Sequence, residues 1–423
     1  MLKSNLSVYQ NGNKYLVINP VVPSWIVTNL NGVALIKMFT ETGSVDKALD
    51  YFSDRKIAIN REVAMAFIKK AAAASLFIDN PEPKKHTPYL LNGIYLNMTD
   101  MCNLRCSYCF AATRNEHGNP PLSLRDYLRI IDEAVSINNN LVVIFTGGEP
   151  LLSPNTLKVA RYAKKLGLET KILTNATLIT EDNVDELIQY FDLFKISIDG
   201  SSEELHDYYR GHGAYKKTIN AIEMLLERGA HVLLAMTVTR ENKADIVPMN
   251  QKWGELLTYQ PLFPLGRAEK NKTLALTGEE YYEALCSGGN INPFSDIETI
   301  IKAHKDKRSI IKCSIGDGEL SISCTGDVYP CQLLHNDDFI LGNVRSSSLY
   351  DIYYSSQNER FKQNTVDTIE GCQDCDFRYL CGGTCQARHF SEMGSIRKSG
   401  DFCAYDKKGI VDGLIQACEL HRL

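Results

Sequence analysis

The residues with the clearest chemical potential are three cysteines in the run MCNLRCSYCF. Cys102, Cys106 and Cys109 are spaced as C-x3-C-x2-C. Thiolates are the ligands of iron–sulfur clusters, and a short loop can present three of them to three corners of a 4Fe–4S cubane. The fourth iron of such a cluster has no protein ligand and is open to chelate a small molecule. A zinc knuckle or unrelated cytosolic thiols are the alternatives, although zinc sites favour paired C-x2-C motifs.

A second set of cysteines gathers near the C-terminus and includes the spacing C-x2-C-x5-C-x3-C. Its members are Cys313, Cys324, Cys331, Cys372, Cys375, Cys381, Cys385 and Cys403. A zinc-ribbon interpretation must distribute these thiols over two tetrahedral sites. All but Cys286 and Cys418 of the 13 cysteines therefore fall in local groups. Because cytosolic thiols stay reduced, this clustering favours metal binding over disulfides.

Composition limits the class of protein. The chain has 423 residues, of which 44% are hydrophobic and 23% are charged, and its net charge is −5. At about 150 residues per domain, this length predicts two to four domains. The charge gives no support for a nucleic-acid partner. No stretch approaches the length of a membrane span and the N-terminus lacks an apolar signal segment, so we expect a cytoplasmic protein with no membrane partner.

The elements that must position the first cysteines begin near Ile94, where apolar strands start to alternate with amphipathic helices. This alternation predicts βα units around a parallel sheet, and hence an α/β fold. The expected strands are Ile94–Met98, Leu141–Phe145, Lys171–Leu173, Leu193–Ile198, His231–Val238 and a strand near Tyr259–Leu262. The expected helices are Leu122–Ile137, Ser153–Leu166, Asn183–Tyr190 and Tyr215–Arg228. The first cysteine motif falls in the loop after the first strand.

Residues 1–82 are predicted to form a separate small domain. Its expected elements are a strand at Tyr15–Asn19, a helix-like stretch at Ser24–Phe39, and helices at Val45–Phe52 and Arg61–Leu76. Ser44 is a suitable N-cap for the second of these helices. This order is compatible with a winged-helix-like unit. The two prolines and charged residues that follow predict a linker at residues 83–90.

The first cysteine motif matches that of the radical S-adenosylmethionine (SAM) enzymes. This resemblance implies that the open iron holds the amino and carboxylate groups of SAM. Reductive cleavage of SAM then gives a 5′-deoxyadenosyl radical. The resemblance also implies that residues 91–305 form a partial (βα)6 barrel, related to the full eightfold barrel. In barrels of this kind, chemistry takes place at the C-terminal ends of the strands.

Three of the predicted strand ends carry residues that this resemblance assigns to SAM. Thr146–Pro150 matches the GGEP motif, in which adjacent glycines let the backbone approach a ligand closely. An arginine after the S-I-D-G segment is suited to fork onto the methionine carboxylate. The implied SAM-binding residues are Gly147, Gly148, Glu149, Asn175, Ser197 and Arg210. The alternative is that polar residues at these ends only hold loops in place.

The C-terminal cysteines, together with the spacing G-x4-C from Gly326 to Cys331, resemble the SPASM domain. The resemblance implies that residues 306–423 hold two auxiliary 4Fe–4S clusters, which makes three clusters in all. Auxiliary cluster I is expected on Cys313, Cys331 and Cys385, with Cys324 as a candidate fourth ligand. Auxiliary cluster II is expected on Cys372, Cys375, Cys381 and Cys403.

Residues 1–82 resemble the RiPP recognition element, which binds the leader of a precursor peptide by adding it to an open sheet edge. The alternative is an ordinary N-terminal cap on the barrel. With the barrel and the SPASM domain, the layout resembles peptide maturases that install cross-links. We therefore predict a radical SAM oxidoreductase that forms an intramolecular thioether in a precursor peptide. An external flavodoxin or ferredoxin is the expected electron donor.

Other functions remain open. Carbon–carbon cross-linking and epimerisation use the same domains, and no general base is assigned from the sequence. A sulfatase maturase making formylglycine is disfavoured, because Gln332 occupies the place of the aspartate that is the proposed base in those enzymes. A non-catalytic peptide-binding module is the alternative from another class, and the intact first cysteine motif argues against it.

Overall fold

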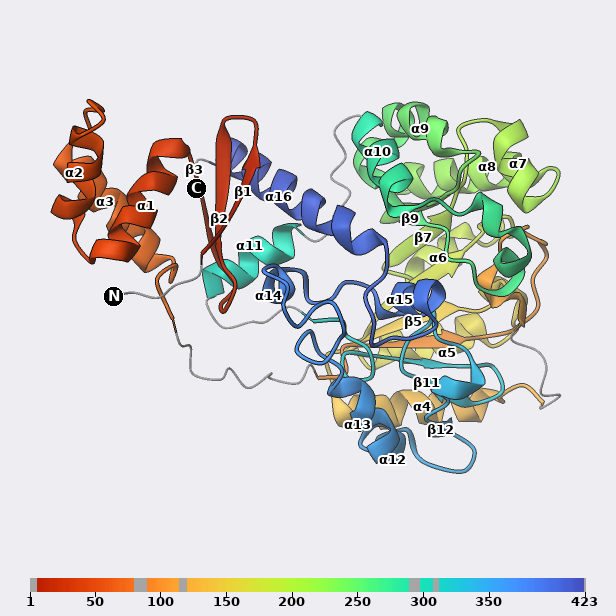
Figure 1. Cartoon of the computed structure of the whole chain (residues 1–423). Helices are drawn as coiled ribbons and strands as arrows, with labels where there is room; N and C mark the ends of the chain where they lie inside the picture. Colours follow the sequence, from red (N-terminus) through yellow and green to blue (C-terminus); the bar gives the residue numbers. More distant parts are fainter. Residues whose placement is uncertain (1–5, 80–89, 114–119, 289–296, 307–311, 422–423) are drawn as a thin grey trace.

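The computed structural model describes residues 6–79, 90–113, 120–288, 297–306 and 312–421 (Figure 1). Of the linker predicted at residues 83–90, all but Leu90 lies outside the described residues. Within the described ranges, the strands form one small three-stranded sheet and one nine-stranded sheet. No helix in these ranges has the length and apolar character needed to cross a membrane.

The N-terminal sheet is antiparallel, in the order β1 (Ser7–Asn11), β2 (Lys14–Asn19) and β3 (Ser24–Thr28). Helices α1 (Leu30–Thr42), α2 (Val45–Ser53) and α3 (Arg61–Ala73) follow. The predicted helix-like stretch Ser24–Phe39 is therefore wrong in its first part. The run SWIVT is aromatic and β-branched, which suits a strand, and the Asn29 side chain accepts from the backbone N–H of Gly32 to start the helix only afterwards.

Both faces of the N-terminal sheet are covered. On one face Leu16, Ile18 and Trp25 pack against the C-terminal helix α16 (Phe402–His421). On the other face Val17 and Ile26 pack against α1 and α3. This division follows from the alternation of side chains along a strand. Figure 1 shows α16 running beside β1–β3, so the first and last segments of the chain share one hydrophobic core.

The larger sheet contains the predicted six parallel strands in sequence order. They are β4 (Gly93–Asn97), β5 (Val142–Thr146), β6 (Glu169–Thr174), β7 (Leu193–Ser197), β8 (Val232–Val238) and β9 (Leu257–Pro261). The helices between them are α4 (Leu124–Ile137), α5 (Thr156–Lys165), α6 (Val184–Tyr190), α7 (Glu203–Arg210), α8 (Ala214–Glu227) and α9 (Ile246–Trp253). The predicted α/β class, with a partial barrel, is confirmed. Helices α7 and α9 were not expected from the sequence.

The sheet continues past β4 into the C-terminal part of the chain. Strand β10 (Glu319–Ile322) pairs with β4 in parallel, and β11 (Asp327–Tyr329) and β12 (Gly342–Asn343) extend the sheet antiparallel. Strands β10 and β11 thus form an antiparallel hairpin. Because β10 and β4 run in the same direction, the loops after both strands lie at the same edge of the sheet.

The remaining C-terminal helices carry or flank the second set of cysteines. They are α12 (Leu349–Tyr353), α13 (Ser356–Lys362), α14 (Arg378–Cys381), α15 (Gln386–Met393) and α16. Helices α10 (Gly278–Ser287) and α11 (Ile297–Asp306) connect the barrel to this region. Figure 1 shows α15 between the barrel and the long helix α16.

Candidate functional site

The loop after β4 holds the first three cysteines close together. Burial raises the pKa of the Cys102 and Cys106 thiols, and Cys109 raises both further. The backbone N–H of Leu104 donates to the Cys102 sulfur at 3.4 Å, a contact that suits a cluster thiolate. Among the described residues, no three His, Cys, Asp or Glu side chains are arranged to hold a single metal ion. Three thiols in one short loop are the donor set that a 4Fe–4S cluster with three cysteine ligands would take.

The two glycines of the GGEP segment lie directly against this loop. The backbone N–H of Gly148 donates to the carbonyl oxygen of Thr99 at 2.7 Å, and that of Glu149 donates to the carbonyl oxygen of Met101 at 2.8 Å. A Cβ atom on Gly148 would lie 2.2 Å from the Met101 oxygen, and one on Gly147 would lie 2.4 Å from the Thr99 oxygen. The glycines therefore let two backbones approach each other, which the sequence analysis did not anticipate.

Glu149 is fully buried and fastens the end of β5 to the end of β6. Its carboxylate accepts from the Thr174 hydroxyl at 2.8 Å and from the backbone N–H of Asn175 at 2.9 Å. Burial raises the pKa of Glu149, and these hydrogen bonds oppose that rise. The predicted contact of Glu149 with the amino group of SAM stays a prediction, and the structure gives the residue an anchoring role as well.

Asn175 connects this anchor to the first cysteine. Its side-chain amide lies 4.0 Å from the Cys102 sulfur and donates to Asn103 Oδ1 at 3.0 Å. The structure thus brings together Glu149, Asn175 and the cysteine loop, as expected for strand ends that share one edge of a barrel.

The predicted residue Arg210 lies at the end of α7 in a buried cluster with two residues that the sequence analysis did not emphasise. Its Nε donates to the Asp199 carboxylate, and its guanidinium also donates to the Tyr108 hydroxyl at 3.1 Å. The Tyr108 hydroxyl in turn donates to Asp199. Burial alone would lower the pKa of Arg210, but Asp199 raises it well above its usual value. The carboxylate that Arg210 contacts here is Asp199, and its contact with SAM stays a prediction.

This cluster clamps the cysteine loop onto the barrel. Tyr108 lies between Cys106 and Cys109, and Asp199 follows β7 and accepts from the backbone N–H of Thr237 at 3.0 Å. Two features of the sequence could have indicated this cluster. They are the aromatic residue Tyr108 inside the C-x2-C spacing and the aspartate Asp199 of the S-I-D-G segment. The backbone N–H of Arg267 adds a contact from the far side of the barrel, donating to the Cys109 carbonyl at 3.0 Å.

Ser197 is the last residue of β7 and lies on the inner side of the barrel. Phe194 and Ile196 belong to the outer core that the helices cover, so by alternation Lys195 and Ser197 face the interior. This places Ser197 on the same side as the clamp, where the sequence predicts SAM.

The C-terminal cysteines form two groups, and their ligation of clusters stays a prediction. In the first group, burial and then Cys385 raise the pKa of Cys313 to about 12. Burial, Glu319, Cys385 and Cys313 raise the pKa of Cys331. In the second group, burial, Cys403 and Cys375 raise the pKa of Cys372 to about 12. Burial raises the pKa of the Cys381 thiol, and Cys375, Cys372 and Cys403 raise it further.

Cys324 is placed apart from the first of these groups. Its buried thiol donates to Asp100 Oδ2 at 3.0 Å, at the edge where β10 and β4 end together. Burial and Asp100 raise its pKa to about 12. The structure therefore brings together Cys313, Cys331 and Cys385, and it places Cys324 beside the loop of the first cysteines. Ligation by Cys324 stays a prediction.

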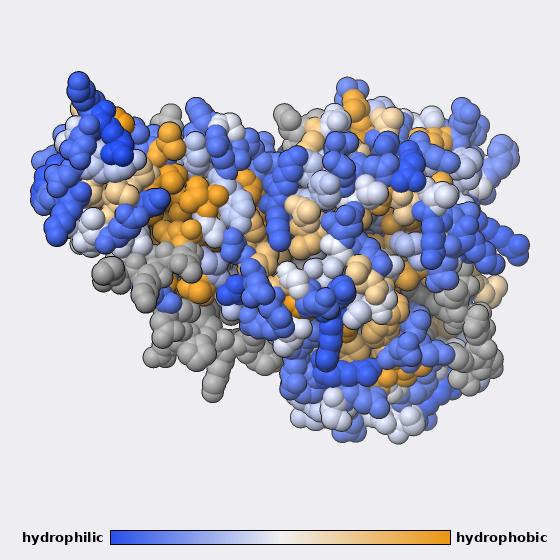
Figure 2. Space-filling model, viewed as in Figure 1, coloured by the Kyte–Doolittle hydropathy of each residue, from blue (hydrophilic) through white to orange (hydrophobic). Residues whose placement is uncertain are grey.

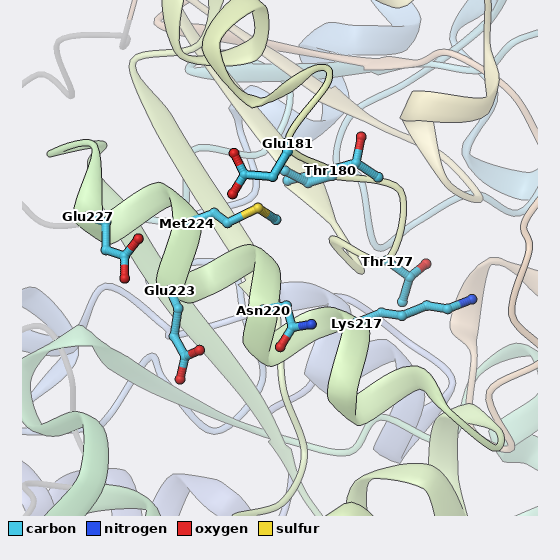
Figure 3. Close-up of a pocket in the computed structure, with 9 residues that line it drawn as sticks. Thr177, Thr180, Glu181, Lys217, Asn220, Glu223, Met224 and Glu227 are labelled. Carbon is cyan, nitrogen blue, oxygen red and sulfur yellow. The ribbon is translucent and has the colours of Figure 1, made fainter.

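A pocket of about 620 Å³ lies outside this site, between α8 and the loop after β6. Figure 3 shows Lys217, Asn220, Glu223 and Glu227 on the helix and Thr177 on the facing loop. None of the predicted site residues lines it. Thr177 links the pocket to the site, because its hydroxyl accepts from the Asn103 side chain at 2.7 Å and donates to Asn175 Oδ1 at 2.6 Å.

The barrel, the three-cysteine loop and the two further thiol groups define a class of iron–sulfur enzyme. Residues 96–251 match the family model of the radical SAM superfamily, and residues 313–376 match that of the SPASM iron–sulfur cluster-binding domain. The chain therefore belongs to the radical SAM superfamily and carries a SPASM domain.

Relatives within this family differ in what their names say they do. The chain is 32% identical over 348 residues to an AdoMet-dependent heme synthase of Oleidesulfovibrio alaskensis, covering 74% of this chain and 86% of that protein. It is 27% identical over 330 residues to the subtilosin biosynthesis protein AlbA of Bacillus subtilis, covering 75% of this chain and 72% of that protein.

Solved structures show the same fold. The enzyme anSMEcpe with bound AdoMet matches with a TM-score of 0.63 at 21% identity, over 78% of this chain and 96% of that chain. SuiB of Streptococcus suis bound to its precursor peptide SuiA matches with a TM-score of 0.57 at 16% identity. The SuiB match covers 95% of this chain and 99% of that chain, so it extends into the N-terminal domain.

Proposed function

We propose that this protein is an oxidoreductase that modifies a ribosomally synthesised precursor peptide and closes an intramolecular thioether in it. The observation that carries the proposal is the attachment of a three-stranded N-terminal domain to a radical SAM barrel and a SPASM domain. SuiB, which was solved with a precursor peptide, is similar over 95% of this chain. The similarity to AlbA, a subtilosin biosynthesis protein, supports the same class of substrate.

The leader of the peptide would bind at the outer edge of β3. Both faces of the sheet are covered, and in the described residues no strand pairs with this edge. The opposite strand β1 is engaged with the C-terminal region, because the Tyr9 hydroxyl donates to Asp376 at 2.7 Å and the Asn11 amide donates to Asp412 at 2.6 Å.

The surface beside the free edge of β3 is apolar. Figure 2 shows hydrophobic residues over the part of the domain where Figure 1 places β3 and α1. Leu30, which follows β3 closely, is 63% exposed. An added strand would gain main-chain hydrogen bonds and apolar contacts there.

The thiols would hold three 4Fe–4S clusters, with Cys102, Cys106 and Cys109 ligating the cluster that shares its open iron with SAM. When bound, that pair supplies a 5′-deoxyadenosyl radical that removes a hydrogen atom from the peptide. The Tyr108–Asp199–Arg210 cluster keeps the cysteine loop in place. The barrel interior would hold the reacting carbon of the peptide and exclude water from it. Closure of the thioether also releases one proton and one electron, and the C-terminal thiols hold the clusters that accept the electron.

The test uses the anaerobically reconstituted full chain, SAM, a reduced flavodoxin or ferredoxin, and the peptide encoded by a short reading frame beside the gene. We expect SAM cleavage, a precursor that is lighter by two hydrogens, and loss of one alkylatable thiol. A lighter peptide that keeps all its thiols would indicate carbon–carbon cross-linking. Unchanged mass excludes both cross-links. The Cys106→Ala variant should cleave no SAM, which separates an enzyme from a peptide-binding module.

Heme synthesis is a second candidate, favoured by the 32% identity to the heme synthase of Oleidesulfovibrio alaskensis. That similarity covers 74% of this chain, and a peptide-binding sheet has no evident use with such a substrate. Incubating the same preparation with a heme precursor and recording its absorption spectrum decides between the two. Conversion of the heme precursor with an unmodified peptide would replace the primary proposal.

A further inference from the structure

A buried ion pair lies between the two groups of C-terminal cysteines. The Arg388 guanidinium, on α15, donates to the Asp406 carboxylate on α16, and the two side chains are 10% and 13% exposed. Arg388 also donates to the Thr384 hydroxyl at 3.0 Å, and its guanidinium carbon lies 4.7 Å from the centre of the Phe402 ring. These contacts fix the charges of Arg388 and Asp406 in a place that water does little to screen, and a second carboxylate, that of Glu392, lies 3.9 Å from the guanidinium.

One side of the pair faces the group of Cys313, Cys331 and Cys385. Cys385 is the N-cap residue of α15, and the backbone N–H groups of Arg388 and Ala387 point to its sulfur. Arg388 follows Cys385 by three residues, so it lies one helical turn along α15 from that thiol, and the paired Asp406 carboxylate is held beside it. Both charges therefore lie near this thiol, whose pKa is raised by burial and by Asp406 and lowered by Arg388.

The other side faces the group of Cys372, Cys375, Cys381 and Cys403. Cys403 lies in the first turn of α16, the helix that carries Asp406. Asp406 follows Cys403 by three residues, so it lies one turn along the helix from that thiol. Burial raises the pKa of the Cys403 thiol, Lys407 and Arg388 oppose that rise, and Asp406 adds to it. The same two charges thus act on a cysteine of each group.

We propose that the Arg388–Asp406 pair sets the reduction potentials of both auxiliary clusters. The proposal rests on the cluster ligands assigned under the proposed function. A buried positive charge stabilises the electron that a cluster accepts and raises its potential, and a buried negative charge lowers it. Held together, the two charges largely cancel at both centres. Arg388 and Asp406 are positioning residues in this scheme, because they act on electron transfer through the clusters and contact no substrate.

A purely structural role makes a different prediction. A buried ion pair that only joins α15 to α16 would be damaged by loss of either partner. Both variants would then behave alike, with lower stability or iron content. An electrostatic role requires opposite effects, because the two partners carry opposite charges.

The experiment is a redox titration of the anaerobically reconstituted full chain, followed by electron paramagnetic resonance, without SAM or peptide. We expect Arg388→Gln to lower the midpoint potentials of both auxiliary clusters and Asp406→Asn to raise them. The double variant should return close to the native values, and Arg388→Lys should stay closest to them. Arg360→Gln is the control, because this exposed guanidinium in the same region donates to the Asp338 carbonyl at 3.0 Å.

Potentials that do not move, or that move in the same direction in both variants with full iron content, overturn the proposal. If Arg388→Gln loses iron, the other two single variants decide. Higher midpoint potentials in Asp406→Asn together with native potentials in Arg388→Lys support the proposal. Any other pair of results refutes it. A native preparation with too little iron and sulfide for three clusters would overturn the cluster assignment together with this proposal. Unshifted potentials in intact clusters would overturn this proposal alone.

Discussion

Gly148 shows how tightly the cysteine loop is packed against the barrel. Its backbone hydrogen bond to Thr99 leaves no room for a side chain, since a Cβ atom would lie 2.2 Å from the Met101 carbonyl oxygen. We expect Gly148→Ala to displace the loop and to lower the iron bound at Cys102, Cys106 and Cys109. Iron analysis and the low-temperature spectrum of the reduced protein measure this. Gly93→Ala is the matched control, because its Cβ would have its nearest neighbour at 3.6 Å; equal iron loss in both variants would contradict the argument.

Asp199 makes a second prediction for a single residue. Loss of the Asp199 carboxylate would leave the buried Arg210 charge without a partner. Breaking a buried ion pair in this way lowers the free energy of unfolding by about 3–5 kcal/mol. We expect Asp199→Asn to lower the free energy of unfolding of the metal-free chain by this order, measured by urea denaturation. In Asp185→Asn, which loses the exposed pair with Arg228, the loss should stay within about 1 kcal/mol. A similar small loss for Asp199→Asn would show that Arg210 finds another partner.

The sequence predicted part of the candidate site but not its side-chain contacts. The cysteine spacings and the GGEP segment were sufficient to indicate which strand ends meet. They did not reveal that Glu149 binds Thr174 and Asn175, or that Asp199 and Tyr108 hold Arg210. Such contacts depend on side-chain direction and distance, which residue type and spacing leave undetermined.

At the level of elements, α7 carries a buried histidine that makes stability depend on pH. His206 accepts from the backbone N–H of Asp199 at 3.3 Å, and burial lowers its pKa to about 4. The unfolded chain binds this proton at about pH 6.5, so stability is present above that pH and is lost as the pH falls towards 4. We expect a loss of about 2 kcal/mol between pH 7 and pH 5 from this residue.

The measurement is urea unfolding of the metal-free chain at both pH values. His206→Gln should weaken the dependence, whereas His212→Gln should not, because the His212 side chain is 98% exposed. An unchanged pH dependence in His206→Gln would place its origin in other groups.

The elements themselves were mostly predictable, and the exceptions have physical reasons. Long buried strands such as β5 and β8 stand out as apolar runs between amphipathic helices. Strand β3 was mistaken for part of a helix, because a five-residue apolar run beside a helix has no periodicity of its own. Helix α7 was missed, because EELHDYYR is short and rich in polar residues, and only its burial against the barrel shows an apolar side.

At the scale of the whole molecule, the N-terminal domain and α16 depend on each other. Ile410, Leu414 and Ile415 of α16 pack against Leu16 and Ile18 of the small sheet. A chain that lacks residues 1–82 would expose this apolar face, and we expect it to aggregate and to unfold at a lower temperature. Light scattering and thermal denaturation measure both effects. Adding Leu414→Gln to the shortened chain should reduce the aggregation; a shortened chain as soluble as the full one would contradict this.

The sequence could predict the order of the three regions but not this packing. Leu16 and Leu414 are separated by nearly the whole chain. The hydrophobic pattern around each residue predicts that one face of its strand or helix is buried, but it does not indicate which element covers that face. What covers a face is decided by tertiary contacts, and hydrophobic periodicity does not contain that information. The placement of Cys324 beside Asp100 is a similar case, since it follows from the long-range pairing of β10 with β4.

That pairing has a consequence for how the protein is made. Leu320 of β10 lies opposite Ile94 of β4, although about half of the chain separates them. While the ribosome synthesises the intervening residues, the β4 side of the growing sheet stays bare and can pair with other nascent chains. Overproduced protein should therefore be lost mainly during translation, and a chaperone that shields sheet edges should raise the yield of soluble enzyme.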